Sequence, residues 1–371
     1  MRATVSLTRT AIGVTLLLGS VVIVGGCDRR APYRIGVVLD ADGVRAASLA
    51  AEEVNAAGGV GGHPIELRNI GGGGSTRAKL ALETAYSLAS DKAILAVVGH
   101  TNSSASLAAS QVYNARHIAQ IAPTTTSPLY GDAGPYSFRL AASDVHQGMF
   151  LADQALRRTP RERVALVYVN DDYGRPLGKV VLAQLRAAGV EPVYDAPYAE
   201  EDTLPVKEIA SALVQARPDL LIWIGRAYDY ARLQPLLAPA LPRLEVIASD
   251  GFGGPALLAD SLHQFDGIKY VRLVDLERPD SLLRKLRALY VRDGFGEPSD
   301  QAILSYDAVR LFAEALRQVG PNREAIRDWL SHVGRDAPPF PGMSGPIAFP
   351  AGGSRVPQYF LRRIGSPRPA S

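Results

Sequence analysis

The sequence contains a single cysteine, Cys27, among its 371 residues. One thiol cannot form an internal disulfide, so the fold must be held by core packing alone. The formal net charge is only +3 and no dense block of Lys or Arg occurs, which argues against nucleic acid as a partner. The hydrophobic and charged fractions, 47% and 21%, are those of an ordinary globular protein.

Signatures of catalysis and of metal binding are also absent. The six histidines are scattered, and no two have the i, i+4 spacing that puts two metal ligands on one helix face. No Gly-x-Ser-x-Gly nucleophile elbow occurs. The run Gly71–Gly74 lacks the Gly-Lys-Ser/Thr ending of a phosphate loop, so a flexible turn is the preferred interpretation. The sequence predicts a binding protein, not an enzyme, with no cofactor and no metal.

The first 26 residues have the organisation of an export signal. Arg2 and Arg9 supply two positive charges with no acid before residue 10, and an apolar run follows over residues 11–24. This pattern is typical of a secretory signal peptide. A helix that spans the bilayer needs roughly 20 apolar residues, so a permanent membrane span is the weaker interpretation.

Cys27 adds a second feature to this signal. The segment Val24-Gly25-Gly26-Cys27 resembles the bacterial lipobox. The resemblance implies that residues 1–26 are removed and that the acylated Cys27 becomes the mature N-terminus. We therefore expect an exported lipoprotein, anchored at the periplasmic face of the inner membrane or the outer face of the cell membrane. An ordinary signal peptide that ends at a chance cysteine is the alternative.

The mature chain of about 345 residues fits two domains. Short apolar runs alternate with helix-like segments, and this plan restarts after about residue 143. Strands are predicted at 35–39, 65–67, 94–99 and 117–121, then at 163–169, 190–194, 220–225 and 245–249. Helices are predicted at 46–57, 78–90, 104–116, 178–188, 206–216, 230–237, 281–291 and 302–319, with a final strand pair at 346–349 and 358–361. Such alternation predicts an α/β fold with two parallel sheets, each covered on both faces.

Five stretches in a fixed order resemble the branched-chain amino-acid (Leu/Ile/Val-binding) type of periplasmic solute-binding protein. They are EVNAAGGVGG at 53–62, VGHTNSS at 98–104, IAPTTT at 121–126, NDDYG at 170–174 and YDA at 306–308. The resemblance implies the type I periplasmic-binding-protein fold, with two Rossmann-like lobes joined by a three-crossover hinge. Mapped here, lobe 1 comprises 34–143 plus 272–339, and lobe 2 comprises 144–271 plus 340–371. It also implies a monomer that captures an amino acid or similar small polar solute between its lobes and delivers it to an ABC permease.

Hydroxyl side chains follow two neighbouring strands of the first predicted unit. Ligands of open α/β sheets bind beyond the carboxyl ends of the strands. Ser103 and Ser104 follow the third strand and open a helix, where free amides and a hydroxyl suit a carboxylate. Thr124 and Thr126 follow the fourth strand. The resemblance implies that Ser103, Thr124 and Thr126 bind the carboxylate of an amino acid, although such residues are often only helix caps.

The second predicted unit supplies the opposite charge. The resemblance implies that Asp250, just past a strand, binds the ammonium group of the ligand, and that Tyr173 contributes from the same unit. Tyr228 or Ala227 is expected to line the cleft, with the alignment uncertain by one residue. The competing interpretations are a turn residue for Asp250, which precedes a glycine, and a packing side chain for Tyr173.

One segment departs from the family pattern. Relatives have a longer loop with an aromatic residue after the first strand, whereas here only residues 40–45 separate strand from helix. This contraction leaves the solute open. It also keeps open the alternative of an envelope enzyme or structural lipoprotein with a degenerate ligand site. A sensory or regulatory lipoprotein of the same fold is a separate alternative.

Overall fold

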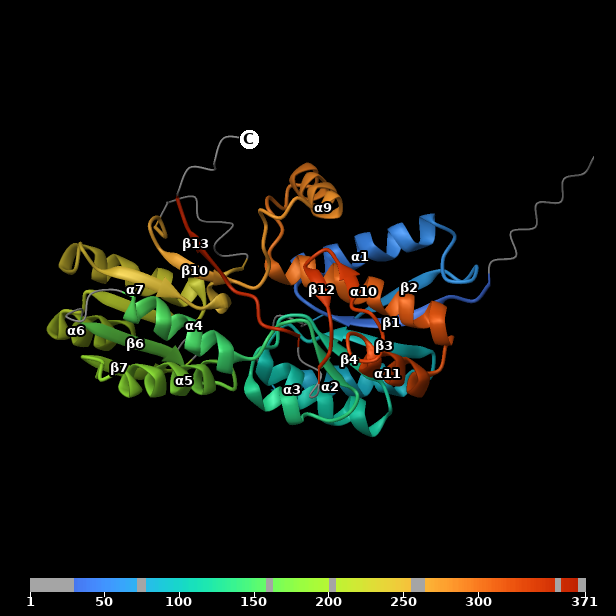
Figure 1. Cartoon of the computed structure of the whole chain (residues 1–371), viewed down its shortest axis with the longest axis horizontal. Helices are drawn as coiled ribbons and strands as arrows, with labels where there is room; N and C mark the ends of the chain where they lie inside the picture. Colours follow the sequence, from blue (N-terminus) through green and yellow to red (C-terminus); the bar gives the residue numbers. More distant parts are fainter. Residues whose placement is uncertain are drawn as a thin grey trace, which may run out of the picture.

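A computed structural model describes residues 30–71, 78–157, 163–199, 205–254, 264–350 and 355–365. The chain forms two α/β lobes that lie side by side (Figure 1). Cys27, the signal segment and most of the Gly71–Gly74 run lie outside the described residues. Within those ranges, no helix has the length and apolar character needed to cross a membrane.

The first lobe is built on a parallel sheet of order β2-β1-β3-β4-β5. Its strands are β1 (Tyr33–Val38), β2 (Ile65–Asn69), β3 (Ile94–Gly99), β4 (Ala119–Ala122) and β5 (Ser137–Arg139). Its helices are α1 (Ala41–Ala56), α2 (Ala78–Ser90), α3 (Ser103–Ala115), α9 (Ser281–Arg292), α10 (Asp300–Val319) and α11 (Arg323–His332). Helices α1 and α10 pack together in one apolar core, and α2 and α3 pack together in another. The central strands are apolar on both sides because helices cover both faces of the sheet.

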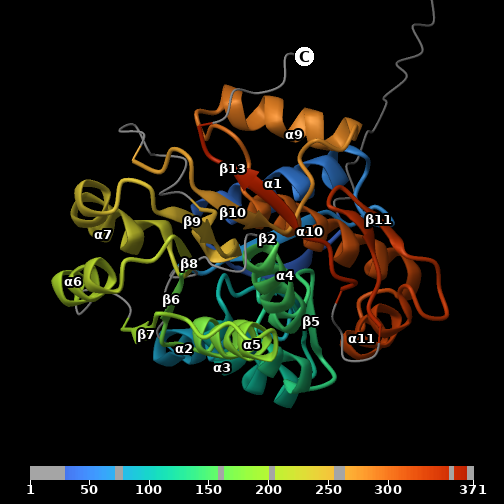
Figure 2. The same cartoon turned by 60° about the vertical axis from the view of Figure 1, so that its left-hand side comes forward.

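The second lobe has a sheet of order β13-β10-β9-β8-β6-β7, parallel except at β13. Its strands are β6 (Val164–Val169), β7 (Tyr194–Tyr198), β8 (Leu220–Ile224), β9 (Glu245–Ala248), β10 (Lys269–Arg272) and β13 (Phe360–Arg363). Its helices are α4 (Asp144–Leu156), α5 (Gly174–Ala187), α6 (Val206–Ala216) and α7 (Ala227–Ala240). Helices α4 and α5 pack together, as do α6 and α7 (Figure 2). The predicted fold class is confirmed in both lobes.

The predicted final strand pair is wrong. The segment at 346–349 contributes β12 (Gly345–Ile347), which forms a hairpin with β11 (Phe340–Gly342). The segment at 358–361 contributes to β13, which pairs antiparallel with β10 at the edge of the second sheet. Each segment is apolar enough to be a strand, but β12 pairs with the adjacent short strand β11, which was not predicted, and the partner of β13 is distant in sequence.

Three further boundaries differ from the prediction. The first helix begins at Ala41, so no loop fills residues 41–45. The strand predicted at 190–194 begins only at Tyr194, because the amides of Gly189 and Val190 still bond to the end of α5. Helices α4 and α11 were not predicted at all.

The chain passes from the first lobe to the second after β5 and returns after β10. The first sheet ends at Arg139 and α4 of the second lobe begins at Asp144. After β10, the chain returns to the first lobe, where Leu273 joins the apolar core. The sequence placed residues 340–349 in the second lobe, but Ile347 and Phe349 pack in the core of the first.

Candidate functional site

A cleft of about 200 Å³ lies between the two lobes. This is smaller than the roughly 300 Å³ at which pockets for drug-sized ligands begin, and it suits a small solute. The first wall comes from the ends of β1, β3 and β4 and the start of α10: Asp40, Thr101, Asn102, Ser103, Thr124, Leu273, Ser299, Asp300 and Gln301. The facing wall comes from the ends of β6, β8 and β9: Tyr173, Arg226, Ala227, Tyr228, Asp250, Gly251, Phe252, Gly253 and Gly254.

Helix α3 begins at the cleft. Asn102, not a serine, caps this helix, because its side chain accepts a hydrogen bond of 3.0 Å from the Ala105 amide. Helix geometry leaves the amides of Ser103 and Ser104 without an intrahelical acceptor, and the positive end of the helix dipole lies there. Ser103 and Thr124 both line the cleft, and the Thr124 hydroxyl donates to the Thr101 carbonyl at 2.8 Å. This end of the cleft can therefore bind an anionic group.

Two predicted ligand residues lie outside the cleft wall. Thr126 is completely buried, and its carbonyl accepts hydrogen bonds from Arg139 (3.1 Å) and from the Asp144 amide (2.8 Å). Ser104 accepts a hydrogen bond of 3.3 Å from the Asp172 amide, which belongs to the other lobe. Thr126 therefore stabilises the loop after β4 from its buried side, and Ser104 forms a contact between the lobes.

Tyr173 and Asp250 come together on the opposite wall, as the sequence predicted. The Tyr173 hydroxyl donates to Asp250 Oδ1 at 2.6 Å and lies 2.7 Å from Ser249 Oγ. Asp171 holds this tyrosine in place, because its Oδ1 accepts from the amides of Tyr173 (2.9 Å) and Gly174 (2.7 Å) at the start of α5. Burial raises the pKa of the Asp250 carboxyl, while the Tyr173 hydrogen bond opposes this shift. A desolvated carboxylate of this kind can bind a cation strongly.

A polar layer that the sequence did not reveal supports Asp250 from α4. Gln147 joins two acids: its Oε1 accepts from the Asp250 amide (3.0 Å) and its Nε2 donates to Asp144 Oδ1 (2.9 Å). Asp144 is fully buried, and burial followed by the charge of Asp250 raises its pKa. Arg139 opposes this shift as the nearby positive charge. Since α4 was not predicted, the sequence offered no signal for Gln147 or Asp144.

Arg226 and Tyr228 complete the second wall. The Arg226 guanidinium lies 5.2 Å from the centre of the Tyr173 ring and forms an ion pair of 3.7 Å with Asp171. Tyr228 is 46% exposed. Tyr228 and Ala227 both line the cleft, so the structure does not choose between these two positions.

The contracted segment after β1 also reaches the cleft. Asp40 caps α1 through a hydrogen bond of 3.0 Å from the Gly43 amide to its Oδ1, and Gln301 donates to the same oxygen at 2.9 Å. Burial raises the pKa of Asp40, and it raises that of Asp42 to about 6. Arg45 does not line the cleft and instead forms an ion pair with Asp293. The sequence treated residues 40–45 only as a missing loop and did not assign Asp40 a role.

Chemistry that needs a metal has no obvious support in this site. Across the described ranges, no group of three or more His, Cys, Asp and Glu side chains could hold a metal ion. The cleft instead offers amides and hydroxyls on one wall and a buried carboxylate on the other, which is an arrangement for binding a polar solute.

Comparisons with known proteins agree with this architecture. The family model "Periplasmic binding protein" matches residues 33–364. An amino acid binding protein of Pseudomonas aeruginosa is 30% identical over 77% of this chain and 76% of its own length. The structure of a branched-chain amino acid transporter substrate binding protein from Streptococcus pneumoniae, in complex with isoleucine, superposes with a TM-score of 0.79. It is 21% identical over 90% of this chain and 96% of that one.

A third similar protein has a different kind of ligand. The solute binding protein of an ABC transporter from Rhodopseudomonas palustris, in complex with 3,4-dihydroxybenzoic acid, has a TM-score of 0.77. It is 16% identical over 90% of this chain and 93% of that one. The fold is thus shared by proteins with chemically distinct ligands. The match of the family model over residues 33–364, together with the two-lobed fold, establishes that this chain belongs to the periplasmic binding protein family of extracytoplasmic solute-binding proteins.

Proposed function

We propose that this protein captures an α-amino acid in the interlobe cleft and delivers it to an ABC permease. The observation that carries the proposal is the opposition of two charges across the cleft. The N-terminus of α3 provides a positive dipole end and donors on one wall, and Asp250 provides a carboxylate on the other. An α-amino acid carries one group of each sign on neighbouring atoms.

The carboxylate of the solute would lie at the start of α3. The Ser103 amide and hydroxyl are its donors, and Thr124, whose hydroxyl donates to the Thr101 carbonyl, lines the same end of the cleft. Hydrogen bonds to a charged acceptor are worth about 1.5–3 kcal/mol each, and the helix dipole adds to them. Thr126 and Arg139 act indirectly, since they hold the loop that carries Thr124.

The ammonium of the solute would lie against Asp250. Tyr173 fixes the Asp250 carboxylate through its hydroxyl, and Gln147 fixes the Asp250 backbone. Both positions are therefore set before the ligand arrives, which lowers the entropy cost of binding. Closure of the lobes about the hinge would then bring the two walls together around the solute. The Ser104–Asp172 hydrogen bond already joins the two lobes beside the cleft.

Asp250 also discriminates between ligand classes that the fold alone permits. A solute with a carboxylate but no cation, such as an aromatic acid, would cover Asp250 without supplying a positive charge to it. An unpaired buried charge is strongly unfavourable. This reasoning favours amino acids over simple carboxylic acids.

The ligand requirement can be tested by calorimetry with the purified mature protein. A panel of L-amino acids should include binders, and the best of these should lose about 100-fold in affinity when its carboxylate is amidated or its amine is removed. The same binder should raise the melting temperature in proportion to RT ln(1 + [L]/Kd). Equal affinity for the deaminated acid would contradict the role of Asp250, and the absence of any amino-acid binder would contradict the proposed function.

We also propose that the protein is held at the membrane through Cys27 and acts as a monomer. The signal segment and the lipobox-like Val24–Cys27 support the anchor, and a single cysteine leaves that thiol free of disulfides. Stable anchoring takes more than one acyl chain. In cell fractionation, the wild-type protein should sediment with membranes and Cys27→Ser should not. Membrane sedimentation of both would contradict lipidation at this residue.

A further inference from the structure

The far end of the cleft from Thr124 has its own polar character. In the first sheet, β1 and β4 lie on opposite sides of β3, so Asp40 after β1 and Thr124 after β4 flank Ser103. Gln301, at the start of α10, connects Asp40 to the segment after β3. It donates one hydrogen bond to Asp40 Oδ1 and another, of 3.3 Å, to Thr101 Oγ1. If the backbone of an amino acid is held by Ser103 and Asp250, this end of the cleft is left for its side chain.

Most side-chain hydrogen-bond donors at this end are already used, with the Thr101 hydroxyl, which accepts from Gln301, as the exception. Both bonds donated by Gln301 Nε2, to Asp40 Oδ1 and to Thr101 Oγ1, employ the hydrogens of that amide. The Ser299 hydroxyl donates to Asp42. What this wall still offers a ligand are mainly acceptors, namely Asp40 Oδ2, which receives neither the Gly43 nor the Gln301 hydrogen bond, and Gln301 Oε1.

The two cleft acids on this wall also differ in charge balance. Asp300 is neutralised by Arg272, whose Nη2 lies 2.7 Å from Oδ1, while Oδ2 accepts from the Leu273 amide at 2.8 Å. Asp40, in contrast, takes part in none of the ion pairs formed among the described residues. Its partial burial raises its pKa, which is the expected effect on a carboxylate that lacks a cation.

We propose that the solute is a basic amino acid, whose side-chain ammonium or guanidinium pairs with Asp40 Oδ2 and Gln301 Oε1. This inference rests on the proposed function, because it takes the ligand backbone to be held by Ser103 and Asp250. A donor-only cation matches a wall that offers mainly acceptors, one of them a carboxylate, whereas the oxygen of a side-chain amide would find only the Thr101 hydroxyl as a side-chain donor. Leu273 and Phe252, which also line the cleft, provide apolar surface for the stem of a long cationic side chain.

The inference separates this chain from its isoleucine-binding structural relative. A branched apolar side chain at the far end would bury Asp40 further without compensating its charge, and that is costly. The contraction after β1 therefore has a specific consequence: it brings a carboxylate to a position where a longer loop would cover the ligand.

Calorimetric titration of the wild-type mature protein with matched pairs tests the inference. L-Lysine is compared with L-norleucine, which lacks only the terminal ammonium, and L-arginine with its neutral isostere L-citrulline. We expect at least one basic member to bind about 50-fold more tightly than its neutral counterpart. Leucine and isoleucine complete the panel.

Asp40→Asn then isolates the charge, because asparagine is an equally good helix cap and keeps an oxygen for Gly43 and Gln301. The variant should keep its melting temperature without ligand and lose most of the preference for the basic member: affinity for the basic member falls, and affinity for norleucine rises, because an apolar side chain no longer buries an uncompensated carboxylate. Asp293→Asn, which removes one negative charge outside the cleft, should change neither affinity.

Each outcome decides the matter. If leucine or isoleucine binds the wild type at least as tightly as lysine and arginine, and Asp250→Asn abolishes that binding, the proposed function stands and this inference is wrong. An unchanged preference for the basic ligand in Asp40→Asn also overturns it. If no amino acid binds at all, the proposed function fails first.

Discussion

Asp250→Asn is expected to lower the affinity for the amino-acid solute by about 100-fold or more. The variant keeps the shape of the side chain and an oxygen that accepts from Tyr173, but it removes the charge that faces the ligand ammonium. Breaking a buried, hydrogen-bonded charge pair costs about 2–5 kcal/mol, and 1.4 kcal/mol corresponds to tenfold in affinity. Calorimetry with the best-binding amino acid measures the loss directly.

The stability of the ligand-free protein, unlike its affinity, should not fall in Asp250→Asn. Burial raises the pKa of Asp250 in the folded protein, so between its ordinary pKa of about 3.9 and the raised value the folded state binds more protons than the unfolded state. The free energy of unfolding contributed by this group therefore falls as pH rises through that window. Above the window, ligand-free Asp250→Asn should be at least as stable as the wild type.

The control for this experiment is Asp195→Asn, an acid on β7 of the same lobe that does not line the cleft. It should bind the amino acid normally. Urea unfolding at pH 5 and pH 8 compares the stabilities. Normal affinity in Asp250→Asn would exclude an ion pair at this position, and a loss of both affinity and stability would assign Asp250 a structural role instead.

Asp307→Ala should lower the free energy of unfolding by about 3–5 kcal/mol. Asp307 lies fully buried on α10, and its two oxygens accept from the Met343 amide (2.7 Å), the Ser344 amide (2.8 Å) and the Ser344 hydroxyl (2.6 Å). Arg355, also buried, donates to Ser344 Oγ at 2.8 Å and to Ser344 O at 2.6 Å. The alanine variant strands these donors and leaves the Arg355 charge without its nearby carboxylate.

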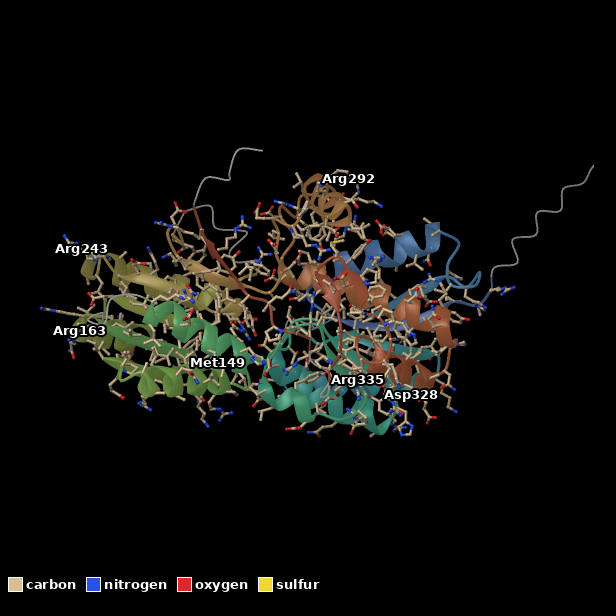
Figure 3. The ribbon with its side chains drawn as sticks, viewed as in Figure 1. Met149, Arg163, Arg243, Arg292, Asp328 and Arg335 are labelled. Carbon is tan, nitrogen blue, oxygen red and sulfur yellow. The ribbon has the colours of Figure 1, made fainter. Side chains whose placement is uncertain are left out.

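Chemical denaturation without ligand measures this loss, with Asp328→Ala on α11 as the control. The Asp328 side chain is 56% exposed at the surface of the first lobe (Figure 3), and surface substitutions usually change stability by less than about 0.5 kcal/mol. A loss below about 1 kcal/mol in Asp307→Ala would mean that the turn between β11 and β12 does not depend on this carboxylate.

The sequence predicted the fold well where periodicity is strong. The limits of α2 and α6 were predicted exactly as found, because both helices have a clear apolar face and a defined end. The prediction failed at β11, which is only three residues long, at its hairpin with β12, and at β13, whose partner β10 only the folded chain brings near. The first helix was started too late because Asp40 was taken as part of a loop, although an aspartate before a helical run is a common cap.

The sequence predicted several residues that line the cleft, but not the residues that hold them in place. Ser103, Thr124, Tyr173, Tyr228 and Asp250 all line one cleft. Thr126 fits the same local pattern, but its burial depends on how the loop folds back on Arg139. Gln147, Gln301 and Asp40 are ordinary polar residues in the sequence, and only tertiary packing brings them to the site. The motif residue Asp307 is likewise far from the cleft wall and stabilises a turn.

The antiparallel strand β13 has a consequence for how the second lobe is completed. Every other strand of that sheet lies between Val164 and Arg272, whereas β13 arrives from Phe360–Arg363. Until it docks, β10 presents a row of unpaired amides and carbonyls, which is a template for association with other chains. Once docked, β13 replaces that surface with a short strand ending in Arg362 and Arg363, and charge at an open edge discourages aggregation. The strand of this sheet that comes last along the chain, β13, is thus the one that covers the edge at which aggregation could begin.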